Sequence, residues 1–117
     1  MLEDKAKELG RMIGQSPEYQ ALKRSSEMLN EDRDAVTLLQ QMEKLRGEAQ
    51  QLIQQGENPT PEMEEKLDSM LEKIQVQPSY QRAVAAQENF DKVMLRVNQW
   101  IMDGMKKGAA SPIITLS

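Results

Sequence analysis

Prolines at the starts of apolar, helix-periodic segments are the feature that most restricts the fold of this chain. Ser16-Pro17-Glu18 and Thr60-Pro61-Glu62 each combine an N-cap residue, a proline for the first helical position and an acidic residue in the first turn. Gln77-Pro78-Ser79 is a weaker start of the same kind, and Gly56 followed by Pro59 is typical of the loop after a helix. The chain is therefore expected to be a series of helices with short connections.

Apolar residues recur between these breaks at the three- and four-residue spacing of amphipathic helices. Nothing before residue 108 alternates with period two, so the prediction is an all-α fold. We expect an antiparallel bundle of about five helices: 2–14, 17 to 28 or 29, 32–55, just after Thr60 to about 75, and 78–107. The stretch Asn30-Glu31-Asp32 leaves open whether the second and third helices are continuous.

The predicted domain is residues 1–107, with 32–55 and 78–107 as its two long helices. Residues 108–117 are interrupted by proline and carry no charge, unlike the helical part. We expect them to form a frayed or extended tail.

The composition excludes several classes of protein. The chain contains neither Cys nor His, which excludes disulfides, thiol chemistry, the usual zinc sites and His-dependent catalysis. Its 15 basic residues are dispersed and are outnumbered by 19 acidic ones, which disfavours direct binding of nucleic acid. No apolar run reaches the roughly 20 residues that a membrane span needs. We expect a cytoplasmic protein without enzymatic activity, cofactor or metal.

The two halves of the sequence resemble each other when one is shifted by 61 positions. Eight of 34 aligned residues are identical: Glu3/Glu64, Lys5/Lys66, Ile13/Ile74, Pro17/Pro78, Tyr19/Tyr80, Gln20/Gln81, Glu27/Glu88 and Val36/Val97. The implied unit is a short helix, a Pro-x-Tyr-Gln corner and a longer helix, arranged twice. Helical hairpins with the same corner chemistry could also look alike without a true repeat.

The fifth predicted helix carries more apolar surface than one contact can bury. Its main stripe runs from Ala83 to Gly104, and a second stripe contains Val84, Leu95 and Met102. Such a helix is either central in its bundle or buried in a subunit interface. Trp and Met are common at interfaces, although core packing explains them too. The candidate residues for a dimer or partner interface are Phe90, Val97, Trp100, Ile101, Met102 and Met105.

Three segments together resemble the YlbF/YmcA family of small helical bacterial proteins: Leu9 to Leu22 (LGRMIGQSPEYQAL), Asp34 to Met42 (DAVTLLQQM) and Pro78 to Ala83 (PSYQRA). The resemblance covers nearly the whole chain and includes no catalytic signature. It implies an adaptor that associates with itself and with family paralogues. It also implies a complex with a third protein, YaaT, that steers the endoribonuclease RNase Y in competence, sporulation and biofilm development. Some members are associated with iron-sulfur clusters held by Cys, which this chain lacks, so no cluster is expected.

Two further features of the sequence have structural explanations that we favour over functional ones. The Tyr19 and Tyr80 corners fit packing against a neighbouring helix better than recognition of a partner. The acidic run from Glu62 to Glu72 lacks His and is interleaved with Lys, which favours a solvated face over a metal site.

The leading functional hypothesis is a homodimeric adaptor that works by protein contacts alone. The alternative is a membrane-surface protein whose last helix lays Trp100, with Lys106 and Lys107, on anionic lipid. A third hypothesis, RNA binding, requires the fold to bring basic side chains onto one face: Arg33, Lys44, Arg46, Arg82 and Arg96.

Overall fold

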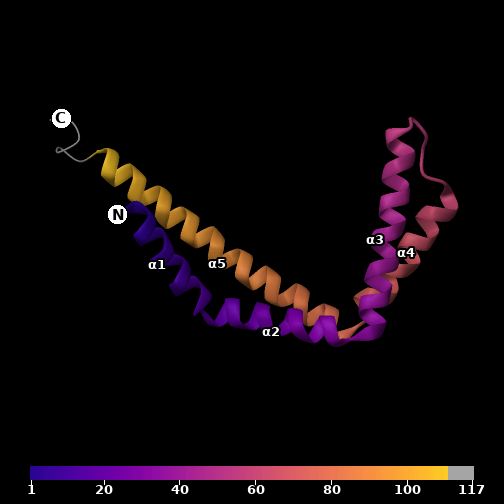
Figure 1. Cartoon of the computed structure of the whole chain (residues 1–117), viewed down its shortest axis with the longest axis horizontal. Coiled ribbons are helices and arrows are strands. Elements are labelled where there is room, and N and C mark those ends of the chain that lie inside the picture. Colours follow the sequence, from indigo (N-terminus) through magenta and orange to yellow (C-terminus); the bar gives the residue numbers. More distant parts are fainter. Residues whose placement is uncertain (111–117) are drawn as a thin grey trace.

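The computed structural model describes residues 1–110, which form five helices and no strand. They are α1 (Leu2–Gly14), α2 (Pro17–Glu31), α3 (Arg33–Gln54), α4 (Pro61–Gln75) and α5 (Pro78–Ala109), labelled in Figure 1. The predicted all-α fold with two long helices is confirmed. Residues 108 and 109, where the tail was expected to begin, belong to α5. Ala110 is the C-cap of that helix, and residues 111–117 of the predicted tail lie outside the described residues.

The helix starts follow from the predicted caps. The hydroxyl oxygen of Ser16 accepts a hydrogen bond from the backbone N–H of Tyr19 at 3.2 Å, and that of Thr60 accepts one from Met63 at the same distance. A proline occupies the first turn of α2, α4 and α5, where its missing N–H has no cost. Cap and proline together thus fix the starts of α2 and α4, whereas α5 begins at its proline without a side-chain cap.

The end of α3 is equally local in origin. Gly56 has a φ of +84°, which side-chain-bearing residues rarely adopt. Its N–H donates to the carbonyl of Ile53 at 3.0 Å, and the N–H of Glu57 donates to that of Leu52 at 2.8 Å. This pair of bonds is a Schellman motif, which satisfies carbonyls at the helix end and turns the chain toward α4.

Asp32 separates α2 from α3. The second and third predicted helices are therefore not continuous, a point that the sequence left open. The backbone of Asp32 is extended (φ −83°, ψ 98°), and one carboxylate oxygen accepts the N–H of Ala35 at 3.2 Å as the N-cap of α3. The other oxygen accepts the hydroxyl of Ser79, at the start of α5, at 2.6 Å. The junction of α2 with α3 is thereby tied to the junction of α4 with α5.

The sequence repeat is also a structural repeat. The side-chain amide of Gln20 donates to the carbonyl of Gly14 at 2.7 Å, and that of Gln81 donates to Gln75 at 2.7 Å. The two corners thus share the same hydrogen bond six residues back along the chain. The repeats differ further on, because Val93 stands at the position equivalent to Asp32 and the helix continues through it.

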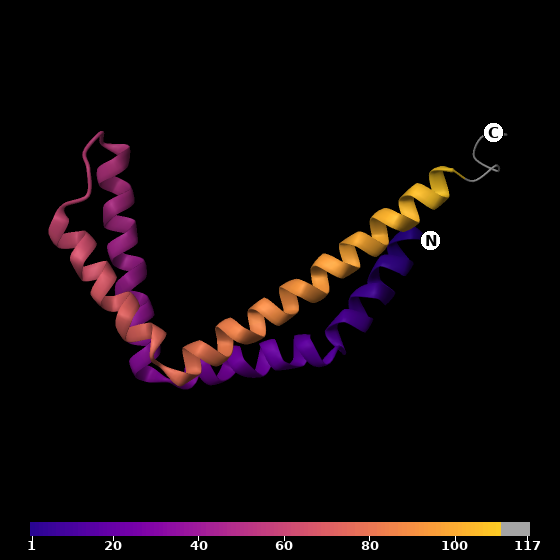
Figure 2. The ribbon, with the colours of Figure 1, turned by 180° about the vertical axis from the view of Figure 1, so that it is seen from behind.

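The helices pack as antiparallel pairs laid out in a V (Figures 1 and 2). One arm contains α1, α2 and α5, and the other contains α3 and α4. The radius of gyration is 21.3 Å, whereas a compact chain of this length would have about 13 Å. The molecule measures 66 × 38 × 19 Å, so it is about two helices thick. Several large apolar side chains are accordingly left exposed, among them Leu95, Trp100 and Met105 of α5.

The best-packed region lies where the arms meet. Ala35 and Ile74 are fully buried there and Met42 almost so. Partly buried side chains from α2, α3, α4 and α5 surround them: Leu29, Leu38, Leu39, Leu67, Met70, Leu71 and Tyr80. This cluster, which we call the vertex core, holds the two arms at their angle.

Candidate protein-interaction surface

The six residues predicted for an interface fall into two groups. Val97 is buried and Phe90 is half-buried within the chain, where the Phe90 ring lies edge-to-face on Tyr19 with centroids 5.5 Å apart. The remaining four, at the C-terminal end of α5, are exposed: Trp100 by 65%, Ile101 by 44%, Met102 by 56% and Met105 by 67%. The structure thus uses two of the six for internal packing and leaves four open to solvent.

The difference between the packed and the exposed residues follows from how far α1 and α2 extend along α5. α2 packs along the first half of α5, the most extensive contact between two helices, and it begins at Pro17. Beyond that point α1 is drawn alongside α5 (Figure 1), and α1 buries none of its side chains. Trp100 therefore continues the stripe of Phe90 and Val97 into a region without comparable cover.

The second apolar stripe of α5 lies on the side away from α2. Successive residues of an α-helix are rotated by about 100°, which places Val84, Leu95 and Met102 nearly opposite Ala86 and Val97. Their exposed fractions are 37%, 60% and 56%. α5 thus has apolar residues on two opposite sides, of which only one is packed against the chain.

Two hollows lie at equivalent places in the two repeats. The first, of about 330 Å³, lies where α4 meets α5 and is lined by Gln75, Tyr80, Gln81, Val84, Ala85 and Glu88. The second, of about 190 Å³, is lined by Gln20, Lys23, Arg24 and Glu27. The shift of 61 superposes Lys23 on Val84 and Arg24 on Ala85, so one hollow is apolar and the other basic. Sequence reasoning missed this difference, although the repeat alignment contains it.

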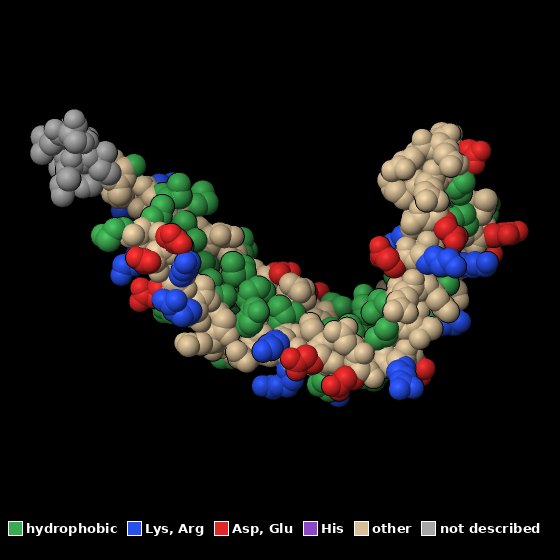
Figure 3. Space-filling model, in the orientation of Figure 1, with side chains coloured by type: hydrophobic (Ala, Val, Ile, Leu, Met, Phe, Trp, Pro, Cys, Tyr) green, Lys and Arg blue, Asp and Glu red, His purple; other side chains and the backbone are tan. Residues whose placement is uncertain are grey.

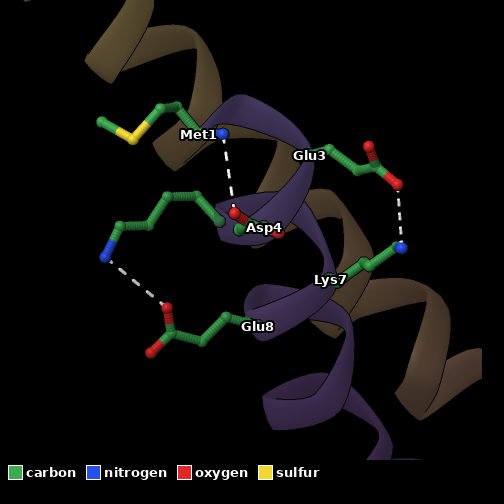
Figure 4. Close-up of polar contacts among 6 residues, drawn as sticks. Met1, Glu3, Asp4, Lys7 and Glu8 are labelled. Carbon is green, nitrogen blue, oxygen red and sulfur yellow. Dashed lines mark ion pairs between the residues drawn. The ribbon is translucent and has the colours of Figure 1, made fainter.

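Charged side chains form no large single-sign patch on the face in Figure 3, where Lys and Arg are interspersed with Asp and Glu. On α1 the charges pair with each other, as Lys7 with Glu3 at 2.8 Å and Lys5 with Glu8 at 3.6 Å (Figure 4). These side chains are mostly exposed, so the pairs contribute little stability. Among residues 1–110, no group of acidic side chains is arranged to hold a metal ion. The five helices of the described range include no candidate membrane span.

Comparison with known proteins assigns this helical chain to a family. Residues 2–106 match the family model described as control of competence regulator ComK, YlbF/YmcA. The chain belongs to the YlbF/YmcA family. This confirms the resemblance found in the sequence, and it assigns the chain to a family named for regulation.

Individual relatives carry the name UPF0342 protein. One from Streptococcus gordonii is 40% identical over 72 residues, which are 62% of this chain and 64% of that protein, just under two thirds of its length. One from Streptococcus mutans is 36% identical over 85 residues, 73% of this chain and 75% of that protein. One from Alkalihalophilus pseudofirmus is 28% identical over 93% of this chain and 92% of its own.

A solved structure shares the fold of this YlbF/YmcA chain. It is Bacillus subtilis RicA, crystallised in complex with RicF, with a TM-score of 0.78. The match covers 92% of this chain and 96% of RicA at 17% sequence identity. The likeness therefore supports the arrangement of the five helices.

Proposed function

We propose that this chain is a non-enzymatic cytoplasmic adaptor that acts by pairing with itself and by binding other proteins. The observation that carries the proposal is the apolar surface on α5, where Trp100, Ile101, Met102 and Met105 are all exposed. Exposed apolar patches of this kind typically mark protein interaction sites. RicA, whose fold this chain shares, was crystallised with a protein partner, which agrees with that interpretation.

The family resemblance extends the proposal to a cellular role. In this role the chain joins a complex of family paralogues that modulates mRNA processing by RNase Y, and thereby competence, sporulation and biofilm formation. Affinity purification from the native host, with co-purifying proteins identified, tests this role. Recovery of RNase Y with the wild-type chain but not with a Trp100→Glu variant supports it, and recovery of no protein partner contradicts it.

Self-association is tested separately on the purified chain. Light scattering is expected to give twice the 13.4 kDa chain mass at micromolar concentration. A mass of one chain throughout that range would contradict pairing, while leaving a heteromeric adaptor role to the affinity experiment.

A membrane-surface role is the second candidate, because the exposed Trp100 is followed by exposed Lys106 and Lys107. Flotation with anionic liposomes separates the two roles. We expect the adaptor to stay in the soluble fraction, since the polar surface carries acidic residues as well.

A further inference from the structure

Five exposed residues of α5 lie on one side of the helix at matched spacings from Leu95. Leu95 lies at the centre, Glu88 and Met102 are seven residues from it, and Val84 and Lys106 are eleven residues from it. Seven and eleven residues are close to whole numbers of helical turns, so all five side chains share one side of the helix. All five are exposed. We call them the α5 row.

The α5 row faces the open side of the V. α2 packs on the opposite side of α5, and the α3–α4 arm rises from the same end of α5 as the apolar hollow (Figure 1). Val84 and Glu88 belong both to the row and to the lining of that hollow. The row therefore runs from the vertex toward the free end of α5.

An antiparallel copy of the row complements it. With Leu95 opposite Leu95 of the second copy, Val84 lies opposite Lys106, and Glu88 lies opposite Met102. One helical turn to the side, Val84 meets Met102 and Glu88 meets Lys106. An apolar contact and an ion pair each form twice, which is the property of a surface that pairs through a two-fold axis.

The lengths of the two halves of α5 suit this arrangement. At about 1.5 Å per residue, Leu95 lies about 26 Å from Pro78 and about 21 Å from Ala109. A second α5 centred on Leu95 therefore reaches almost to the vertex without overrunning the α3–α4 arm. Its methionine-rich end then lies beside the apolar hollow of about 330 Å³.

The same chain cannot fill its own hollow with this end. α5 is one unbroken helix from Pro78 to Ala109, so its C-terminal end cannot fold back on its beginning. A second copy supplies that end in the required direction, together with the Lys side chain that matches Glu88.

We infer, building on the proposed self-association, that two copies pair through their α5 rows. The helices run antiparallel with the two-fold axis at Leu95, and the end of each α5 lies in the V of the other copy. The assembly is closed, because each row is used once.

Cross-linking tests this geometry directly, because the chain has no cysteine. A Leu95→Cys variant places two thiols at the axis and is expected to form a disulfide-linked dimer under mild oxidation, visible on a non-reducing gel. The matched control is Ile53→Cys, on α3, where the native side chain is 54% exposed. Equal yields from both variants, or no linked dimer from Leu95→Cys, would overturn the inference.

Charge substitutions test the same contact without a covalent bond. Leu95→Glu brings like charges together and is expected to weaken the dimer at least about tenfold in sedimentation, while Ile53→Glu leaves it unchanged. Glu88→Lys weakens the dimer, and the added Lys106→Glu change restores it. Unaltered helical circular dichroism checks that each variant is folded.

These outcomes separate the pairing geometry from the proposed function. A dimer that Leu95→Glu leaves intact overturns the α5 row and keeps the adaptor function. A wild-type chain that never dimerises overturns both the row and self-association.

Discussion

Asp32 ends one helix, caps the next and connects this junction to α5. Its carboxylate caps α3 through Ala35 and accepts the Ser79 hydroxyl from the start of α5. The hydrogen bond from Ser79, and then the one from the Ala35 N–H, lower the pKa of Asp32 below its ordinary 3.8. Because the folded state favours the carboxylate, its stabilising effect is complete above the ordinary pKa and is lost as the pH falls through the lowered one.

Removing the donor in a Ser79→Ala variant is expected to lower the Tm at neutral pH. The difference from wild type should vanish as the pH falls below the lowered pKa of Asp32, where the carboxyl is protonated in both proteins. Thermal melts followed by circular dichroism at neutral and acid pH measure this, with the exposed Ser26→Ala as control. A Tm difference that is independent of pH would mean that Ser79 does not act through the carboxylate.

Ile74 is the largest side chain that is completely buried, and it lies in the vertex core. An Ile74→Ala variant is expected to lose about 3 kcal/mol of unfolding free energy, because it leaves a cavity where the arms meet. Urea denaturation measures this. Val76→Ala, two residues on but 69% exposed, should be nearly neutral, and equal losses would argue against a vertex core.

At the scale of helices, the sequence predicted most of what the structure contains. The prolines placed the starts of α2, α4 and α5, and side-chain caps support the first two, because these signals act within one turn of the chain. The apolar stripes predicted which side of each helix avoids water. They could not tell Val97 from Trp100, which share a stripe, because the difference depends on where α2 begins in space. The apolar hollow could not be predicted for the same reason, because it forms only where α4 meets α5 in space.

Two glycines give a matched test of how α3 is built. Gly56 needs its positive φ, so Gly56→Ala is expected to destabilise the fold by about 1 kcal/mol. Gly47 lies inside α3 with nothing within 4 Å of an added Cβ, so Gly47→Ala is expected to stabilise it by up to about 1 kcal/mol. Urea denaturation of both variants measures the pair. The same sign for both changes would contradict the assigned helix end.

At the scale of the whole molecule, the V is the feature that periodicity could not predict. Helical spacing shows that one face of a helix is apolar and should be buried. It does not show whether the same chain or another protein buries that face. Here the chain covers the vertex and leaves much of α5 open, so most of the candidate interface could be named from sequence but not its geometry.

Solution scattering tests the shape. A monomer of this chain, which the Leu95→Glu change is designed to give, is expected to have a radius of gyration close to 21.3 Å, since the vertex core holds the arms apart without a partner. A value near the roughly 13 Å of a compact chain would show that the arms close on each other.

The difference between Asp32 and Val93 makes the two similar halves of the chain unequal, because the helix breaks at Asp32 and continues through Val93. Two identical halves would offer the same long helix at either end, and copies joined through both ends would grow into an open chain. Because only the second half keeps its helix unbroken, each molecule has one long helix to offer, and the pairing proposed above would stop at two copies. In the proposed pairing, the helix break at Asp32 would thus limit the assembly to two copies.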